Sequence, residues 1–294
     1  MTEQLVVDLP THRAAALAWG PPDGRLVLAL HGYPDTAWTW RHLGPDLAAH
    51  GYRVVAPFLR GYAPSEVPVD RCFHPAALMA DAVSLHRALG GDERAVLVGH
   101  DWGAIATNGL GAHPDSPFER IVSMAVPPFP ALGPTGPRVL ARQARMSWYI
   151  GFNQLPLLPE RALPRMVAKL WRDWSPSYDG NEDVRLVLDA LASPTNRSAA
   201  LGYYRSVVRR VPEPYRTWKR SWTAMPTVPF LYLHGDQDGC MQVELADRLR
   251  AHLPPGSRYE VVGGAGHFLQ VEQPDVVNGL IRDFLADASP TSEA

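Results

Sequence analysis

Short apolar runs and helically spaced segments alternate along the first half of the chain. Runs typical of buried or half-buried strands occupy residues 6–9, 13–19, 25–30, 52–57, 95–98 and 121–126. Between them, residues 38–50 and 74–89 place apolar side chains at helical spacing, and glycine follows each segment. Strands that alternate with helices in this way predict a mostly parallel sheet with helices on both of its faces.

The strand pattern stops between residues 129 and 225 and then resumes. Helices rich in aromatic residues are predicted there at residues 138–155, 160–174, 181–191 and 196–211, the third of them capped by Asn181. Two more strands at residues 228–234 and 257–262 and a helix at residues 273–286 complete the pattern. We therefore expect an α/β core formed by residues 1–128 and 226–294, into which residues 129–225 are inserted as a helical lid.

The composition is that of a globular protein. Of the 294 residues, 46% are hydrophobic and 20% are charged, and the net charge of −2 argues against nucleic acid as a partner. The sequence contains no secretory signal and no run of about 20 apolar residues that would form an integral membrane segment. The two cysteines, Cys72 and Cys240, are too few for a disulfide framework. We expect a cytoplasmic monomer or homodimer.

Charge is distributed unevenly between the two predicted parts. Residues 129–225 contain fifteen Lys and Arg against seven Asp and Glu, whereas the rest of the chain contains thirteen against twenty-three. A basic lid is attracted to an acidic core, and such complementarity is the commoner reason for this division. A membrane-surface or anionic-substrate site on the lid is the alternative.

The segment Gly99-His100-Asp101-Trp102-Gly103 follows a buried strand and precedes small apolar residues that favour a helix. Glycine on both sides of the central residue is typical of a turn so tight that strand and helix backbones nearly touch. Such a turn exposes its central side chain, here that of Asp101. An ionised carboxylate can displace a leaving group from saturated carbon and form an ester. The alternative is that Asp101 only caps the helix.

Two later segments supply partners for such a nucleophile. His267 follows the last predicted strand in a glycine-rich loop, from which its imidazole can reach the turn. Asp238 follows the preceding strand, where a carboxylate can orient the histidine and stabilise its charged form. Asp236 competes for this role; we favour Asp238 and interpret Asp236 as a turn residue.

The segment His31-Gly32-Tyr33-Pro34 ends another predicted strand, beside the turn. The backbone N–H groups of Tyr33 and Trp102 can bind the oxyanion that forms when an ester is hydrolysed. An ordinary Gly-X-Pro turn explains the backbone pattern but not its position next to Asp101. We also expect five side chains to contact the substrate: those of His31, Pro34, Trp102, Tyr203 and Phe268.

Taken together, the His31–Pro34 loop, the turn at Asp101, Asp238 and the Gly266-His267 loop resemble the α/β-hydrolase superfamily, in which nucleophile, acid and histidine follow in this order. Within it, nearly the whole chain resembles the epoxide hydrolases that use an aspartate nucleophile. Haloalkane dehalogenases share the His-Asp-Trp-Gly turn and resemble the chain almost as well. The resemblance implies an α/β-hydrolase fold with a helical lid and with neither cofactor nor metal.

The leaving group separates these two families. An epoxide oxygen leaves as a strongly basic alkoxide, so its opening near neutral pH requires a proton or hydrogen-bond donor. Epoxide hydrolases present two lid tyrosines for this purpose. The segments around Tyr149 and Tyr204 resemble those that carry them, and Tyr203 stands where Trp is common. Tyr33, where dehalogenases tend to have Asn or Glu, also favours an epoxide hydrolase.

The resemblance therefore implies an enzyme that converts an apolar small-molecule epoxide of unspecified size to a vicinal diol. Asp101 forms an ester while Tyr149 and Tyr204 donate to the opening oxygen. His267, oriented by Asp238, then activates the water that hydrolyses the ester. A haloalkane or haloacid dehalogenase with the same triad is the first alternative, and a non-catalytic ligand-binding protein of this fold is the second.

Overall fold

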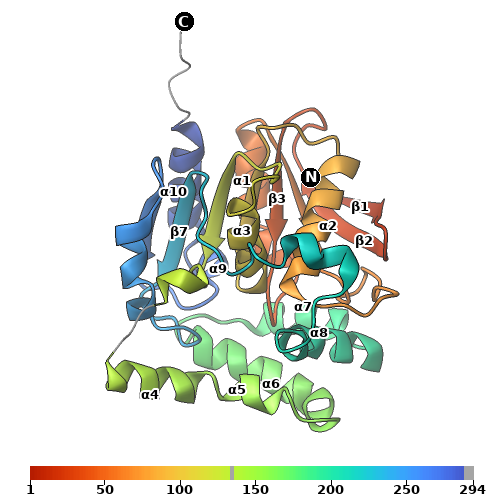
Figure 1. Cartoon of the computed structure of the whole chain (residues 1–294), viewed down its shortest axis with the longest axis vertical. Coiled ribbons are helices and arrows are strands. Elements are labelled where there is room, and N and C mark those ends of the chain that lie inside the picture. The colour runs from red at the N-terminus through yellow and green to blue at the C-terminus, as the bar shows by residue number, and fades with distance from the viewer. Residues whose placement is uncertain (133–135, 288–294) are drawn as a thin grey trace, which may run out of the picture.

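The structure, a computed structural model, describes residues 1–132 and 136–287. An eight-stranded sheet with the order β1-β2-β4-β3-β5-β6-β7-β8 forms its centre (Figure 1). β1 pairs with β2 and β2 with β4 in antiparallel fashion, and all other pairs are parallel. The predicted mostly parallel sheet is therefore confirmed. The strands are β1 (Glu3–Asp8), β2 (Arg13–Trp19), β3 (Arg25–Leu30), β4 (Tyr52–Pro57), β5 (Val96–His100), β6 (Arg120–Met124), β7 (Phe230–Gly235) and β8 (Arg258–Val262).

Helices cover the sheet in two pairs. α2 (Pro75–Ala88) packs against α3 (Trp102–Gly111), and α1 (Leu43–Ala49) packs against α10 (Pro274–Ala286). Every residue of β5, β6 and β7 is consequently buried, which explains why apolar residues predominate in these strands. The core also contains short helices: η1 (Ala37–Trp40), η4 (Val243–Leu245), η5 (Asp247–His252) and α9 (Leu269–Glu272).

Residues 129–225 are called the inserted segment below, and its helices between residues 137 and 206 lie in the lower part of the molecule as drawn in Figure 1. The indole of Trp171 donates to the Pro34 carbonyl, after β3, and the N–H of His267, after β8, donates to the Trp174 carbonyl. The segment therefore covers the end of the sheet from which these loops emerge. Its helices are η2 (Phe129–Ala131), α4 (Pro137–Met146), α5 (Trp148–Phe152), α6 (Leu158–Trp174), α7 (Asn181–Ala190), α8 (Pro194–Ser206) and η3 (Glu213–Trp218).

Two predicted helices are divided in the structure. The one expected at residues 138–155 consists of α4 and α5, which are separated at Ser147. The backbone of Ser147 (φ −87°, ψ 13°) departs from the helical conformation, and its hydroxyl accepts a hydrogen bond from the Gln143 side-chain amide (Nε2–Oγ 3.0 Å). The one expected at residues 38–50 is likewise divided into η1 and α1.

The capping role predicted for Asn181 is wrong. α7 begins at Asn181 itself, after Gly180, and the side chain of Asp179 accepts the Asn181 N–H (3.2 Å). Within the described residues, no helix is long and apolar enough to cross a bilayer.

A buried ion pair joins the inserted segment to the core. The guanidinium of Arg41, beside η1, donates to Asp183 in α7 (Nη1–Oδ1 2.6 Å), and the hydroxyl of Tyr178 donates to the other oxygen of the same carboxylate (2.9 Å). Asp183 is only 2% exposed. Removal of Arg41 would leave the buried charge of Asp183 uncompensated, which costs more free energy of folding than replacing both partners.

We therefore expect Arg41→Ala to lower the free energy of unfolding by about 3 kcal/mol. The control is Arg185→Ala, because Arg185 pairs with Asp189 on the same helix but both side chains are more than 60% exposed. Equilibrium unfolding in urea should show a change of less than about 0.5 kcal/mol for the control. Equal losses in the two variants would contradict the role assigned to Asp183.

Candidate active site

Asp101 lies in the turn between β5 and α3, with a positive φ of 52°. This conformation is strained for a residue with a side chain. The turn lies so close to β3 that a Cβ atom at Gly103 would be 2.2 Å from the Leu30 carbonyl oxygen, so only glycine fits there. The Asp101 side chain makes no capping hydrogen bond; its Oδ1 instead accepts the backbone N–H of Tyr33 at 2.7 Å. The interpretation of Asp101 as only a helix cap is therefore wrong.

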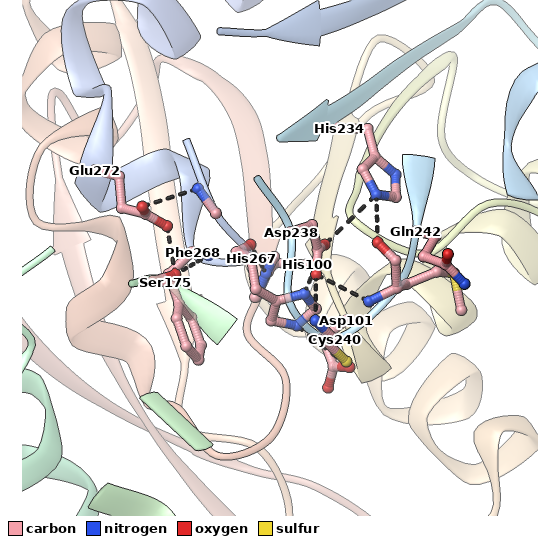
Figure 2. Close-up of polar contacts among 12 residues, drawn as sticks. His100, Asp101, Ser175, His234, Asp238, Cys240, Gln242, His267, Phe268 and Glu272 are labelled. Atoms are coloured by element: carbon pink, nitrogen blue, oxygen red, sulfur yellow. Dashed lines mark hydrogen bonds and ion pairs between the residues drawn. The ribbon is translucent and has the colours of Figure 1, made fainter. Parts of the chain in front are cut away.

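The imidazole of His267 lies between two carboxylates (Figure 2). Its Nδ1 is 2.9 Å from Oδ2 of Asp238, and its Nε2 is 3.7 Å from Oδ2 of Asp101. All three side chains are buried. Asp236 is exposed and accepts the N–H of Gly264 (2.8 Å). Of the two candidate acids, the structure thus brings Asp238 to the histidine and leaves Asp236 in a turn.

Backbone N–H groups fix the orientation of Asp238. Its Oδ1 accepts the N–H of Cys240 (2.6 Å) and that of Met241 (2.9 Å), which leaves Oδ2 directed at His267. Burial raises the pKa of Asp238, but the charge and hydrogen bond of His267 outweigh burial and lower it overall. Asp238 is therefore kept as a carboxylate.

One carbonyl of the inserted segment holds the loops of both Asp238 and His267. The Trp174 carbonyl, at the end of α6, accepts the N–H of His267 (3.0 Å) and that of Gly239 (3.1 Å). A Cβ atom at Gly239 would lie 2.0 Å from the Asp173 carbonyl oxygen, so this approach requires glycine. The sequence motifs did not indicate this contact, because it is made by backbone atoms.

A second hydrogen-bonded group, also not predicted, supports the loop that carries His267. The hydroxyl of Ser175 donates to Glu272 (2.5 Å) and accepts the N–H of Phe268 (3.3 Å). Glu272 also accepts the N–H of Gly266 (2.8 Å), as Figure 2 shows. The residues on both sides of His267 are thereby tied to the polypeptide around them.

The two carboxylates determine the protonation of His267. Burial lowers its pKa, but Asp238 and Asp101 outweigh burial and raise the pKa to about 10. The histidine is therefore an imidazolium at neutral pH, and it forms a charged triad with the carboxylates. If Asp101 lost its charge, one of the two negative charges that raise the pKa of His267 would disappear, and this pKa would fall.

The loop after β3 provides an N–H donor beside Asp101. The Tyr33 N–H already contacts Asp101, and the N–H of Trp102, the first residue of α3, has no intrahelical acceptor. His31 fixes this loop: its Nδ1 is 2.8 Å from the Gly32 carbonyl oxygen, and its Nε2 accepts the N–H of Leu59 (3.0 Å). Both ring nitrogens of His31 are occupied within the protein, and contact of His31 with the substrate stays a prediction.

The two predicted tyrosines of the inserted segment lie close to the turn at Asp101 and to each other. The ring centroid of Tyr204 is 5.1 Å from those of Tyr33 and Trp102 and 5.6 Å from that of Tyr149. The Tyr149 hydroxyl is 3.5 Å from Sγ of Cys240, whereas the buried Tyr204 hydroxyl has no hydrogen-bond partner among the described residues. Burial, with a contribution from Asp101, raises the pKa of both phenols well above 10. Both therefore keep their protons.

The other predicted substrate contacts belong to the framework of the site. The Tyr203 hydroxyl donates to the Arg60 carbonyl (2.9 Å). Phe268 is fully buried, and its ring stacks on that of Trp171 with centroids 3.5 Å apart. Trp171 also donates to the Pro34 carbonyl (2.8 Å). These contacts show how Tyr203 and Phe268 are held within the protein, and their contact with a substrate stays a prediction.

The described residues bring one group of possible metal ligands together. Atoms of Asp238, Cys240 and His267 lie within 4.8 Å of one another. Asp238 and His267 already bond to each other, and burial raises the pKa of the Cys240 thiol well above its usual value. Because a metal binds the thiolate, this group is better suited to acid–base chemistry than to metal binding.

Comparison with known proteins agrees with this geometry. The profile of the α/β hydrolase fold family matches residues 25–274, and the chain belongs to this family. The chain is 30% identical to epoxide hydrolase A of Mycobacterium tuberculosis over 97% of each protein. It is also 30% identical to epoxide hydrolase 4 of Mus musculus, over 94% of this chain and 76% of that protein. A crystal structure of an epoxide hydrolase from Vigna radiata covers 98% of both chains with a TM-score of 0.77 and 25% identity. Within the α/β hydrolases, the chain thus belongs to the epoxide hydrolases, as its motifs predicted.

We expect the Asp101→Asn variant to titrate His267 at a lower pH than the unmodified protein, in which the pKa is raised to about 10. The amide keeps an oxygen for the Tyr33 N–H but carries no charge. The measurement is a titration of the imidazole nitrogen signals by NMR. Because a raised pKa stabilises the folded state below the unfolded pKa of about 6.5, the unmodified protein should lose this stability as the pH rises toward 10. An unchanged His267 pKa in the variant would show that Asp101 does not act on the imidazole.

Proposed function

We propose that the chain hydrolyses epoxides through an ester formed on Asp101. The Asp101 carboxylate attacks an epoxide carbon; a new C–O bond forms, the epoxide C–O bond breaks, and the released oxygen takes up a proton. The observation that carries this proposal is the charged triad, in which the side chain of Asp101 lies beside an imidazolium held by Asp238. Membership of the epoxide hydrolases supports the same chemistry.

Tyr149 and Tyr204 donate hydrogen bonds to the epoxide oxygen as the ring opens. The proposal is supported by their burial, by the raised pKa of both phenols and by the unpaired hydroxyl of Tyr204. A phenol that stays protonated can stabilise a developing alkoxide at every pH at which the protein is folded.

One proton cycles through the reaction. The resting site holds the carboxylate of Asp101 beside the imidazolium of His267. Ring opening consumes one proton and converts Asp101 to a neutral ester, which lowers the pKa of His267. The imidazolium therefore gives up the proton that balances the one taken up by the released oxygen, and its imidazole is left neutral. The site therefore becomes competent for base catalysis when, and only when, the ester has formed.

Neutral His267 then deprotonates a water that attacks the ester carbonyl. Asp238 stabilises the imidazolium that results, and the N–H groups of Tyr33 and Trp102 stabilise the oxyanion. Collapse of the tetrahedral intermediate breaks the ester bond and releases a vicinal diol. Asp101 returns to the carboxylate, and the imidazolium of the resting site is restored.

Residues 129–225 act as a lid that completes the site, and the substrate is apolar. Tyr149 and Tyr204 both come from this segment, and aromatic rings of Tyr33 and Trp102 lie beside them. The aromatic lining favours a hydrocarbon substituent on the epoxide. Residues 1–128 and the described part of residues 226–294 form the core that carries the triad.

His267→Gln should stop ester hydrolysis while leaving ester formation possible. Mass spectrometry of this variant after exposure to an epoxide should show an increase equal to the mass of the substrate. Asp101→Ala is the control, because it removes the nucleophile and should show neither the mass increase nor any diol. The absence of an adduct in His267→Gln would contradict the two-step scheme.

Tyr204→Phe should lower the rate of diol formation about a hundredfold, because a donor to the leaving oxygen is lost. Tyr203→Phe is the matched control: it removes the neighbouring hydroxyl, which bonds to the Arg60 carbonyl, and should keep most activity. Diol formation from aryl, terminal alkyl and fatty epoxides is measured beside halide release from haloalkanes. Halide release that tolerates Tyr204→Phe, without diol, would favour a dehalogenase; inactivity toward both substrate classes would favour a ligand-binding protein.

A further inference from the structure

Exposed apolar side chains are concentrated in one part of the inserted segment. Six of the twelve large hydrophobic residues that are exposed in the described chain fall within residues 140–158, and they are 40% to 66% exposed. They are Leu140, Trp148, Ile150, Leu155, Leu157 and Leu158. Isolated exposed hydrophobic residues are common on proteins, but such a concentration marks an interaction surface.

The same region is strongly basic. Residues 136–172 contain seven Lys and Arg and a single acidic residue, Glu160, which pairs with Arg205 (2.6 Å). None of the ion pairs within residues 1–132 and 136–287 involves the five arginines Arg138, Arg142, Arg145, Arg161 and Arg165. Their charges are therefore available to an external anion. Figure 1 shows α4 and α5 at the outer edge of the molecule, away from the sheet.

A basic hollow includes Trp148, one of these exposed apolar residues. It has a volume of about 380 Å³ and is lined by Arg142, Arg145, Lys169 and Trp148, together with Met146, Asp173, Trp174 and Gly239. Asp173 is the acidic residue of this lining, and it pairs with Lys169 and Arg172. Three cations beside an indole suit a phosphate group whose attached chains are apolar.

We propose that residues 137–172 form a surface that docks on anionic phospholipid membranes. The leucines and Trp148 enter the boundary between headgroups and acyl chains, and the arginines bind lipid phosphates. Docking is peripheral, since no described helix can span a bilayer. The charge argues for lipid rather than for a second copy of the chain, because two such basic surfaces repel each other.

Sedimentation with vesicles tests this proposal. The full chain should bind vesicles of phosphatidylcholine and phosphatidylglycerol in equal parts, and it should bind vesicles of phosphatidylcholine alone about tenfold or more weakly. Arg142→Gln combined with Arg145→Gln should weaken binding to the anionic vesicles about tenfold or more. Leu157→Ser combined with Leu158→Ser should have a similar effect, because apolar contact with lipid is lost. Each variant changes only exposed side chains, so circular dichroism should match that of the unmodified protein.

Matched controls distinguish binding through this surface from nonspecific adsorption of the protein to vesicles. Val69→Ser removes an apolar side chain that lies outside the inserted segment and is more exposed than Leu157 or Leu158. Arg209→Gln combined with Arg210→Gln removes the same charge elsewhere in the inserted segment. Both controls should bind as the unmodified protein does. The proposal is overturned if the chain ignores anionic vesicles, or if the Arg209/Arg210 control loses as much binding as the Arg142/Arg145 variant. It is also overturned if sedimentation velocity shows a dimer that the Leu157/Leu158 variant abolishes while vesicles are not bound.

Discussion

The close approach of three backbone segments at Asp101 is the constraint on which the site depends. The helix after Asp101 touches the end of β3 at Gly103, and the loop after β3 directs the Tyr33 N–H at the carboxylate. A side chain at Gly103 would separate these segments and would move the oxyanion donors away from the nucleophile. The positive φ of Asp101 is the cost of this arrangement, and the packing of β5 and α3 in the buried core maintains it.

The chemistry depends on how charge is balanced around one buried imidazole. Two carboxylates face His267 in the structure, and in the proposed mechanism covalent attack neutralises one of them. In that mechanism the same histidine is an imidazolium before the ester forms and a base afterwards. The surrounding hydrogen bonds to Asp238 and to the loop of His267 keep this geometry while the charges change.

The sequence predicted those features of the fold and site that depend on a side chain within a recognisable sequence pattern. The strands β5 and β6 consist mainly of apolar residues because they are buried, and Asp101, Asp238 and His267 each stand in the turn or loop that follows a strand. The division of the helix at Ser147 was not predictable from apolar spacing, since apolar residues continue on both sides of Ser147. Contact of His31 and Phe268 with the substrate stays a prediction, because sequence position does not reveal which way a side chain in a loop points.

The Trp174 carbonyl links two loops of the site that are separate in the sequence. It belongs to the inserted segment, and it holds both the loop of the base and the loop of the acid. Under the mechanism proposed above, a displacement of α6 that broke both of these hydrogen bonds would free the loop of His267 and the loop of Asp238 together. An ester present at that moment would persist until both loops returned, because His267 activates water only while Asp238 orients it. The position of α6 would then set when the ester is cleaved.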